Sequence, residues 1–249
     1  MIIRKLKDAL REKAWIFLKV KWKLRSGLFI KVENDSDWFV FNEIFTNKEY
    51  DPAFRLFLSN ISSNPLVVDL GANVGYFTLR VADEMLLAGH TDFTIVSLEA
   101  SPSNFAILQR RLVQPLLKNK VKYFLGLAGH KTGSASVVHS NQHYGHSSAG
   151  DAAAGTATTV SYVDIETLTG SNEKRIGLLK CDIEGSEEIF ISAYAGLLQR
   201  VDTAVFELHA GECNVENCRK MLENAGLFSK GIIKEDPPYR TTVEIFSRL

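Results

Sequence analysis

The stretch VVDLGANVGYFTLRVADEM, residues 67–85, begins as an apolar strand, turns through two glycines and continues with helical spacing. In an open sheet of parallel strands, ligands bind at the carboxyl ends of the strands, where such turns lie. Gly71 allows a tight bend, and Gly75 lets the helix start close to the strand or to a ligand. Asn73 stands where a dinucleotide-binding G-x-G-x-x-G pattern has its middle glycine. The turn therefore disfavours a nicotinamide cofactor and favours a ligand with an amino-acid-like, partly cationic end next to Asp69.

Apolar runs recur along the chain as LVVDL, FTIVSLE, KVKYFLGLA, IGLLKCDIE and TAVFELH. Between them we expect helices at roughly 74–88, 103–117, 186–199 and 214–226. Strands that are apolar almost throughout and separated by helices predict a doubly wound parallel sheet that is covered on both faces. The run YRTTVEIFSRL, residues 239–249, alternates in polarity and predicts a last strand that pairs antiparallel at or near the sheet edge.

The chain is expected to divide into an N-terminal basic helix with a lead-in, residues 1–60, and an α/β domain, residues 61–249. Residues 1–25 carry nine Lys or Arg against two acidic side chains. Their apolar residues lie near helical spacing, which predicts a helix that either packs on the domain or contacts an anionic surface. Residues 129–158 are rich in Gly, Ser, Ala and His and predict an insertion, which is either a lid over a substrate or a plain surface loop.

Composition and charge exclude several classes of protein. The chain has 249 residues, is 45% hydrophobic and 23% charged, and has a formal net charge of zero, so it has no overall nucleic-acid footprint. Three sparse cysteines indicate a reduced, cytoplasmic protein without a disulfide framework. No apolar run approaches the roughly 18 residues of a membrane span, and the basic N-terminus lacks the apolar core and cleavage site of a signal peptide.

Four motifs together resemble the FkbM family of S-adenosylmethionine-dependent methyltransferases: VVDLGANVGYFTL, SLEASPSNFAILQRRL, LLKCDIEGSEEIF and VFELH. They occur in the family's order over roughly residues 64–210. The resemblance implies a class I methyltransferase fold, which is Rossmann-like, with S-adenosyl-L-methionine as the cofactor. It also implies O-methylation of a hydroxyl on a small molecule or sugar. No nucleic acid is expected as a partner.

The resemblance further implies which residues hold the cofactor. Those around its methionine part are Asp69, Gly71, Ala72, Asn73 and Gly75, with Tyr76 and Phe77 just behind. Glu99, which ends the second strand, is expected to accept both ribose hydroxyls. Those near the adenine are Ala100, Ser101 and Asn104, together with Gly126 and Ala128 from the third strand. Asp182 is a further cofactor contact.

A second group of polar residues ends the later strands. Residues two apart in a strand point to the same face, so KCDIE pairs Asp182 with Glu184 if the strand persists that far. In the same way, FELH pairs Glu207 with His209. Methyl transfer to a hydroxyl requires a general base or a metal that lowers the hydroxyl pKa, so these four are the catalytic candidates and Mg²⁺ is an optional cofactor. The alternative is that the acidic residues, with Glu187, only stabilise the next helix N-terminus.

Two other functions remain open at this point. One is a nucleotide-cofactor oxidoreductase of the NAD type, which the missing middle glycine disfavours. The other is a non-catalytic ligand-binding domain with the same fold, which would be expected to lose the acidic and histidine positions that this chain keeps. Lys180 precedes the acidic group and is expected to be a solvated or salt-bridged residue. The identity of the acceptor does not follow from the sequence.

Overall fold

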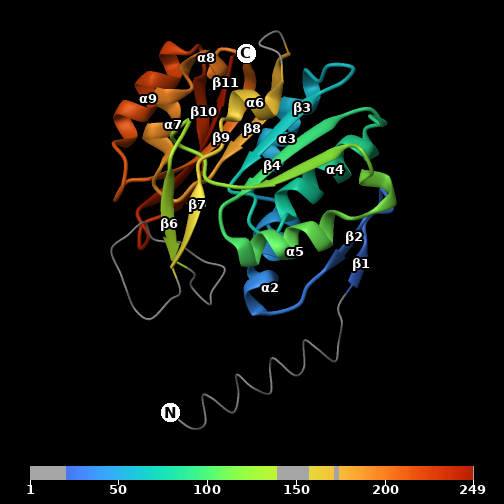
Figure 1. Ribbon diagram of the computed structural model, residues 1–249. Coiled ribbons are helices and arrows are strands. Elements are labelled where there is room, and N and C mark those ends of the chain that lie inside the picture. Colours follow the sequence, from blue (N-terminus) through green and yellow to red (C-terminus); the bar gives the residue numbers. More distant parts are fainter. Residues whose placement is uncertain (1–20, 139–156, 171–173, 249) are drawn as a thin grey trace.

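A seven-stranded sheet runs through the centre of the computed structural model, which describes residues 21–138, 157–170 and 174–248 (Figure 1). Its strand order is β10-β11-β9-β8-β3-β4-β5. In chain order these strands are β3 (Leu66–Leu70), β4 (Thr94–Glu99), β5 (Val121–Leu125), β8 (Ile176–Cys181), β9 (Val201–His209), β10 (Phe228–Asp236) and β11 (Thr241–Ser247). β11 pairs antiparallel with β9 and β10, and the other neighbours pair parallel. The predicted sheet, mostly parallel with an antiparallel last strand, is confirmed.

The edge strand β10 is absent from the sequence prediction, and the predicted last strand, β11, lies one place inside the edge. The first five residues of β10 are exposed, so its sequence FSKGIIKED lacks the apolar pattern of the buried strands. Its pairing with β11 is irregular between Ser229 and Gly231 and again between Ile232 and Lys234. An exposed, bulged edge strand has little apolar periodicity, which explains why the sequence did not predict β10.

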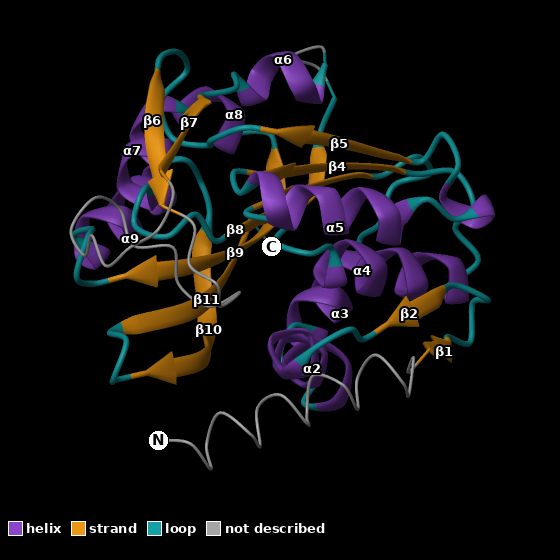
Figure 2. Ribbon diagram, turned by 60° about the horizontal axis from the view of Figure 1, so that its bottom comes forward, coloured by secondary structure: helices purple, strands orange, loops and turns teal. Residues whose placement is uncertain are grey.

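Helices cover both faces of the sheet, as predicted. Val67 of β3 belongs to a core cluster with residues of α3 (Asp51–Ser59), α4 (Tyr76–Leu87) and α5 (Pro102–Leu112). Its neighbour Val68 points the other way, into a cluster with α6 (Ile165–Thr169), α7 (Glu187–Ala193), α8 (Ala195–Leu198) and α9 (Val215–Asn224). Figure 2 shows α3, α4 and α5 together on one side of the sheet.

Two of the predicted helices are shorter than expected. The helix expected at 103–117 ends at Leu112, and Pro115 begins a separate 3₁₀ turn, Pro115–Leu117. A proline inside a helix removes a backbone donor and clashes with the preceding turn, so the break falls just before it. The helix expected at 186–199 is divided into α7 and α8 at Tyr194, whose φ of −116° and ψ of 29° are not helical.

The lead-in before β3 packs onto the sheet. It contains the antiparallel ribbon of β1 (Lys21–Lys23) and β2 (Phe29–Lys31), followed by α2 (Asp35–Phe41), a π-helical turn (Asn42–Thr46) and α3. Its buried residues Ile30, Ile44 and Phe54 belong to the same core cluster as Val67 of the central sheet. The prediction of a basic helix within residues 1–25 is wrong at its end, because Lys21–Lys23 pair with β2 as a strand. Its first 20 residues lie outside the described residues.

Part of the predicted insertion at 129–158 forms a second antiparallel ribbon. It consists of β6 (Ser134–Val138) and β7 (Ala157–Ser161), which pair along their whole length. Residues 139–156 lie outside the described residues, so the role of the insertion as a lid stays a prediction. Within the described part of the chain, no helix has the length and apolar character needed to cross a membrane.

Candidate active site

A cavity of about 600 Å³ lies at the carboxyl ends of β3, β8 and β9. Nine of the predicted site residues line it, namely Gly71, Ala72, Asn73, Tyr76, Phe77, Asp182, Glu184, Glu207 and His209. Eight others do not line it, namely Asp69, Gly75, Glu99, Ala100, Ser101, Asn104, Gly126 and Ala128. The cavity therefore brings the predicted catalytic group together with the methionine end of the predicted cofactor site.

The glycine turn after β3 is held tightly by the rest of the chain. Gly71 has a φ of +73°, and a Cβ atom there would lie 1.6 Å from the carbonyl oxygen of Asp182. The backbone N–H groups of Gly71 and Ala72 both donate to the carbonyl oxygen of Leu98, at 3.0 and 2.9 Å. Glycine is thus required at position 71 because β3 and β8 approach each other closely, as well as because of its φ.

Glu99 stabilises the same turn. Its carboxylate accepts hydrogen bonds from the backbone N–H of Asn73 at 2.7 Å and of Ser101 at 2.8 Å. Asn73 has a φ of +50°, a left-handed conformation that asparagine tolerates better than most residues. The side chain of Glu99 thus connects the turns after β3 and β4, and its expected contact with ribose hydroxyls stays a prediction.

Asp69 lies under the turn and is completely buried. Thr78 Oγ1 donates to its Oδ2 at 2.7 Å, and Lys180 Nζ lies 3.7 Å from its Oδ1. Burial raises the pKa of Asp69 more than its contacts with Lys180 and Thr78 lower it. Asp69 therefore stabilises the turn from beneath. It does not line the cavity, whereas Gly71 and Ala72 do.

On the adenine side, the third-strand positions are tightly packed. A Cβ atom on Gly126 would lie 2.3 Å from Cγ2 of Val163, and Ala128 is buried. Ser101 caps α5, since its hydroxyl accepts a hydrogen bond from the backbone N–H of Asn104 at 3.4 Å. The expected adenine contacts of these residues and of Ala100 stay predictions.

Lys180 connects the two halves of the site. Its Nζ donates to the carbonyl oxygen of Gly71 at 2.9 Å and to Asp182 Oδ2 at 3.1 Å. Although burial lowers the pKa of Lys180, the carboxylates of Asp182 and Asp69 raise it above its ordinary value, so the side chain remains a cation. The expected salt bridge is confirmed. Its second bond, to the glycine turn, could have been found from the parallel pairing of Lys180 with Asp69.

Asp182, Glu184, Glu207 and His209 lie close together, as predicted. Glu184 belongs to a turn and not to the strand that was expected to carry it. One ligand atom from each of Asp182, Glu207 and His209 lies within 4.8 Å of the others. β8 ends at Cys181, and Glu184 has a φ of +54°, so Glu184 is in a turn and does not share a strand face with Asp182. It reaches the group through its Oε2, which lies 3.3 Å from His209 Nε2.

His209 lies between two carboxylates. Its Nδ1 is 3.1 Å from Glu187 Oε1, and Glu184 holds its other ring nitrogen. Burial lowers the pKa of His209, but the hydrogen bonds to Glu184 and Glu187 raise it further, to about 11. The imidazole is therefore a cation at neutral pH. Glu187 Oε1 also accepts from the backbone N–H of Ile183 and Gly185, at 3.1 and 3.2 Å, which is the structural role expected for it before α7.

The surroundings of Glu207 favour its neutral form, whereas those of His209 favour its charged form. Burial, with the nearby charge of Asp182, raises the pKa of Glu207 to about 8, and the cations of His209 and Lys180 offset only part of this effect. A carboxyl group that titrates close to neutral pH in a cavity can take up and release a proton there. Of the predicted catalytic residues, Glu207 is the best suited to act as a general base.

The far wall of the cavity comes from segments that sequence reasoning did not connect with the site. Glu43 and Glu49 belong to the lead-in, whereas Lys234 belongs to β10. Lys234 Nζ lies 2.5 Å from Glu43 Oε1 and 3.5 Å from Glu49 Oε2, so it joins β10 to the lead-in at the cavity wall. No sequence signal pointed to this contact, because β10 itself was not predicted.

Known proteins with similar sequences are methyltransferases. The family model described as Methyltransferase FkbM domain matches residues 69–226. Methyltransferase 1 of Beauveria bassiana is 26% identical over 227 residues, which cover 80% of this chain and 85% of that protein. Methyltransferase sdnD of Sordaria araneosa is 34% identical over 74 residues, which cover 30% of this chain and only 24% of that protein.

A solved structure shares the fold. Methyltransferase FkbM from Methylobacillus flagellatus matches with a TM-score of 0.54 and 14% sequence identity, over 94% of this chain and 58% of that one. The chain thus spans little more than half of that structure. The similarity confirms the predicted class I methyltransferase fold.

Proposed function

Since the chain belongs to the FkbM methyltransferase family, we propose that it transfers a methyl group from S-adenosyl-L-methionine to a hydroxyl of a small molecule or sugar. The observation that carries the proposal is the cavity in which the glycine turn faces Asp182 and Glu207. The family supports methyl transfer in general. Oxygen as the acceptor atom is supported by the chemistry of Glu207, because a hydroxyl requires a base before it becomes a good nucleophile.

The residues present fit the cofactor. S-adenosyl-L-methionine supplies an electrophilic methyl group on a sulfonium cation and carries an amino-acid end. Gly71, Ala72 and Asn73 line the cavity where that end would lie. The carboxylate of Asp182, and that of Glu207 once it has lost its proton, put negative charge at the side of the cavity where a cation is favoured. Glu99 holds the turn in shape from behind.

In the proposed reaction, Glu207 accepts the proton of the acceptor hydroxyl while the oxygen forms its bond to the methyl carbon. The carbon–sulfur bond breaks in the same step, and its electron pair neutralises the sulfonium. Lys180 fixes the carboxylate of Asp182 against the carbonyl of Gly71, so the base side of the cavity and the cofactor turn keep their spacing. Positioning of this kind is a large part of the advantage that an enzyme offers.

In the proposed reaction His209 does not remove the proton and acts on Glu207 instead. As a cation held by Glu184 and Glu187, it is poorly suited to remove a proton near neutral pH. Its charge acts on Glu207 and lowers the pKa of that carboxyl from the still higher value that burial alone would give. His209 therefore tunes and positions the base.

Mg²⁺ fits this group of residues poorly, although the three ligand atoms are close enough to share an ion. Both ring nitrogens of His209 are engaged by carboxylates, and Asp182 is paired with Lys180. Mg²⁺ prefers oxygen ligands in near-ideal octahedral geometry and keeps several waters. The proposed reaction therefore involves no metal, and the optional Mg²⁺ expected from the sequence can be tested with a chelator.

Two measurements test the proposal. Titration calorimetry with S-adenosyl-L-methionine and with NAD should give binding to the first alone. The oxidoreductase alternative requires the reverse. Incubation with a panel of polyols, sugars and small hydroxylated compounds should then yield S-adenosylhomocysteine together with a methylated product, located on oxygen by mass spectrometry. Cofactor binding without turnover on any acceptor, or methylation on nitrogen or carbon, contradicts the proposed reaction.

A further inference from the structure

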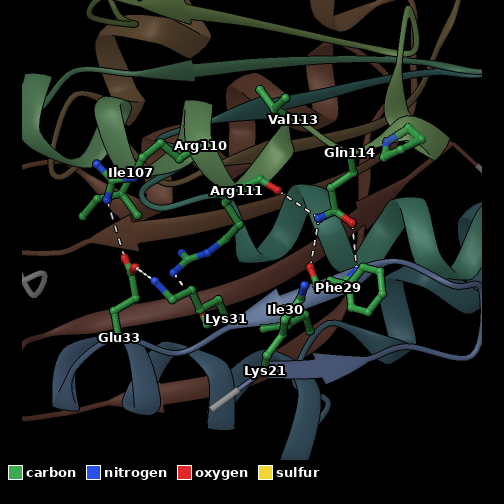
Figure 3. Close-up of a pocket in the computed structure, with 11 residues that line it drawn as sticks. Lys21, Phe29, Ile30, Lys31, Glu33, Ile107, Arg110, Arg111, Val113 and Gln114 are labelled. Atoms are coloured by element: carbon green, nitrogen blue, oxygen red, sulfur yellow. Dashed lines mark hydrogen bonds and ion pairs between the residues drawn. The ribbon is translucent and has the colours of Figure 1, made fainter. Parts of the chain in front are cut away.

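A second cavity, of about 400 Å³, lies between the ribbon β1–β2 and the end of α5 (Figure 3). Basic side chains at its rim are Lys21, Lys31 and Arg110, and apolar Phe29 and Val113 also line it. The amide of Gln114 holds the ribbon in place, because it accepts from the backbone N–H of Phe29 at 2.8 Å and donates to the carbonyl of the same residue at 2.9 Å. These two hydrogen bonds fix the ribbon beside the end of α5, so the surface between them has a defined shape.

This surface is strongly basic. Lys21, Lys23, Arg25 and Lys31 are all exposed on the ribbon and its turn. Among the lining residues that the structure describes, the one carboxylate belongs to Glu33, which pairs with Lys31 and lies 3.6 Å from Arg110. The ribbon also follows directly on residues 1–20, whose sequence holds six more Lys or Arg against two acidic residues.

Exposed apolar side chains lie among these charges. Val113 is 72% exposed, and Phe29 and Leu116 are each 41% exposed. A Cβ atom on Gly27 would lie 3.4 Å from Leu116, which places Leu116 beside the β1–β2 turn. Lys21 Nζ lies 4.2 Å from the centre of the Phe29 ring, so charge and apolar surface are directly adjacent.

We propose that this basic–apolar face, which consists of the β1–β2 ribbon and residues 110–116, docks on a bilayer surface that contains anionic lipid. Basic side chains near such a surface are attracted to the headgroups, while an exposed phenylalanine such as Phe29 favours the boundary between headgroup and acyl chain. The exposed aliphatic side chains Val113 and Leu116 favour a bilayer over a nucleic acid, since they can enter the acyl boundary but offer no ring for a base to stack on. The proposal does not depend on the methyl acceptor.

The test measures binding of the full chain to vesicles of neutral phosphatidylcholine, with and without phosphatidylserine. A Lys21→Glu/Lys23→Glu variant is compared with a Lys122→Glu/Lys220→Glu control, which changes the net charge equally. Both control residues are exposed and outside this face, and Lys220 is on α9, at the other end of the molecule from the ribbon (Figure 1). Each basic residue near the surface contributes roughly fivefold in affinity, so the first variant should lose at least about 25-fold and the control far less.

Val113→Asp reports on the apolar contribution, and it should weaken vesicle binding even at a salt concentration where the charge contribution is screened. Circular dichroism verifies that each variant is folded. Equal losses in the two charge variants, or binding to neutral vesicles alone, overturn the proposal. It is also overturned if single-stranded RNA binds the wild type more tightly than the anionic vesicles do and the same ribbon variant abolishes that binding.

Discussion

Arg111 and Asp37, which are 74 positions apart in the chain, form a buried ion pair with 2.9 Å between Nη2 and Oδ2. The same guanidinium donates to the carbonyl oxygen of Val74 at 2.7 Å and to that of Lys31 at 3.0 Å. Its plane lies over the ring of Tyr76, 4.1 Å from the ring centre. One side chain thus joins the lead-in to the turn that is expected to hold the cofactor.

Arg111→Met should be strongly destabilising, because it leaves the Asp37 carboxylate buried without its partner. Loss of one member of a buried pair costs about 3–5 kcal/mol. The adjacent Arg110→Met is the matched control. The Arg110 side chain is 66% exposed and its nitrogen lies 3.6 Å from Glu33, so its loss should cost at most about 1 kcal/mol. Urea unfolding measures both, and similar losses would mean that the buried pair contributes nothing special.

Gly71→Ala should disrupt the fold of the cofactor turn before any ligand is present. The added methyl group meets the backbone of Asp182 at 1.6 Å, and the φ of +73° is strained for alanine. Gly196→Ala is the control, since it lies in helix α8 with nothing near its Cβ, and it should be neutral or stabilising by up to about 1 kcal/mol. Thermal unfolding without cofactor is the measurement. A normal melting temperature for Gly71→Ala would contradict this reading of the turn.

Methyl transfer should become faster as the pH rises through about 8, because Glu207 is protonated below that pH and acts as a base above it. Glu207→Gln should remove this pH dependence and lower kcat by roughly 10²–10⁴-fold, with a smaller effect on cofactor affinity. Glu235→Gln, the same substitution at an exposed position of β10, should leave the profile unchanged. The measurement is the pH profile of kcat for each protein. An unaltered profile in Glu207→Gln would mean that another residue is the general base.

His209 should stabilise the folded protein at acidic and neutral pH. Its pKa is raised in the folded state from an ordinary 6.5 to about 11, so its contribution is fully present below pH 6.5 and is lost as the pH rises toward 11. The free energy of unfolding of His209→Gln should therefore fall furthest below wild type at the low end of this range. His130→Gln, the same substitution at an exposed position, is the control. A constant difference across the range would mean that the ring is neutral.

Activity should survive dialysis against a chelator, because both nitrogens of His209 and one oxygen of Asp182 already have partners within the chain. Turnover is measured on the treated protein before and after Mg²⁺ is added back. Loss of turnover that Mg²⁺ restores would assign Asp182, Glu207 and His209 as metal ligands.

The central sheet could be predicted because its strands are buried on both faces, and continuous apolar runs such as LVVDL report that burial directly. The meeting of Asp182 with Glu207 and His209 followed from the same logic, since strand ends in a parallel sheet share one edge. Local strand periodicity failed at Glu184, where the chain had already left β8.

The remaining parts of the site depend on contacts between distant segments, which no local pattern contains. Lys234 pairs with Glu43 across 191 positions, and the two residues come from an exposed edge strand and a π-helical turn. The protonation of His209 was also hidden, because it depends on Glu187, a residue whose expected role was only structural. Sequence alone predicted a histidine in the site but could not give its charge.

The position of β11 has a consequence for synthesis on the ribosome. β11 is made after both β9 and β10, yet it lies between them in the sheet. Until Thr241–Ser247 have left the exit tunnel, one side of β9 has no strand to bond with in the native arrangement, and unpaired strand edges are prone to associate with other chains. The nascent protein therefore presents an open edge beside Glu207 and His209 until β11 has emerged, and a chaperone that covers this edge during that interval would prevent such association.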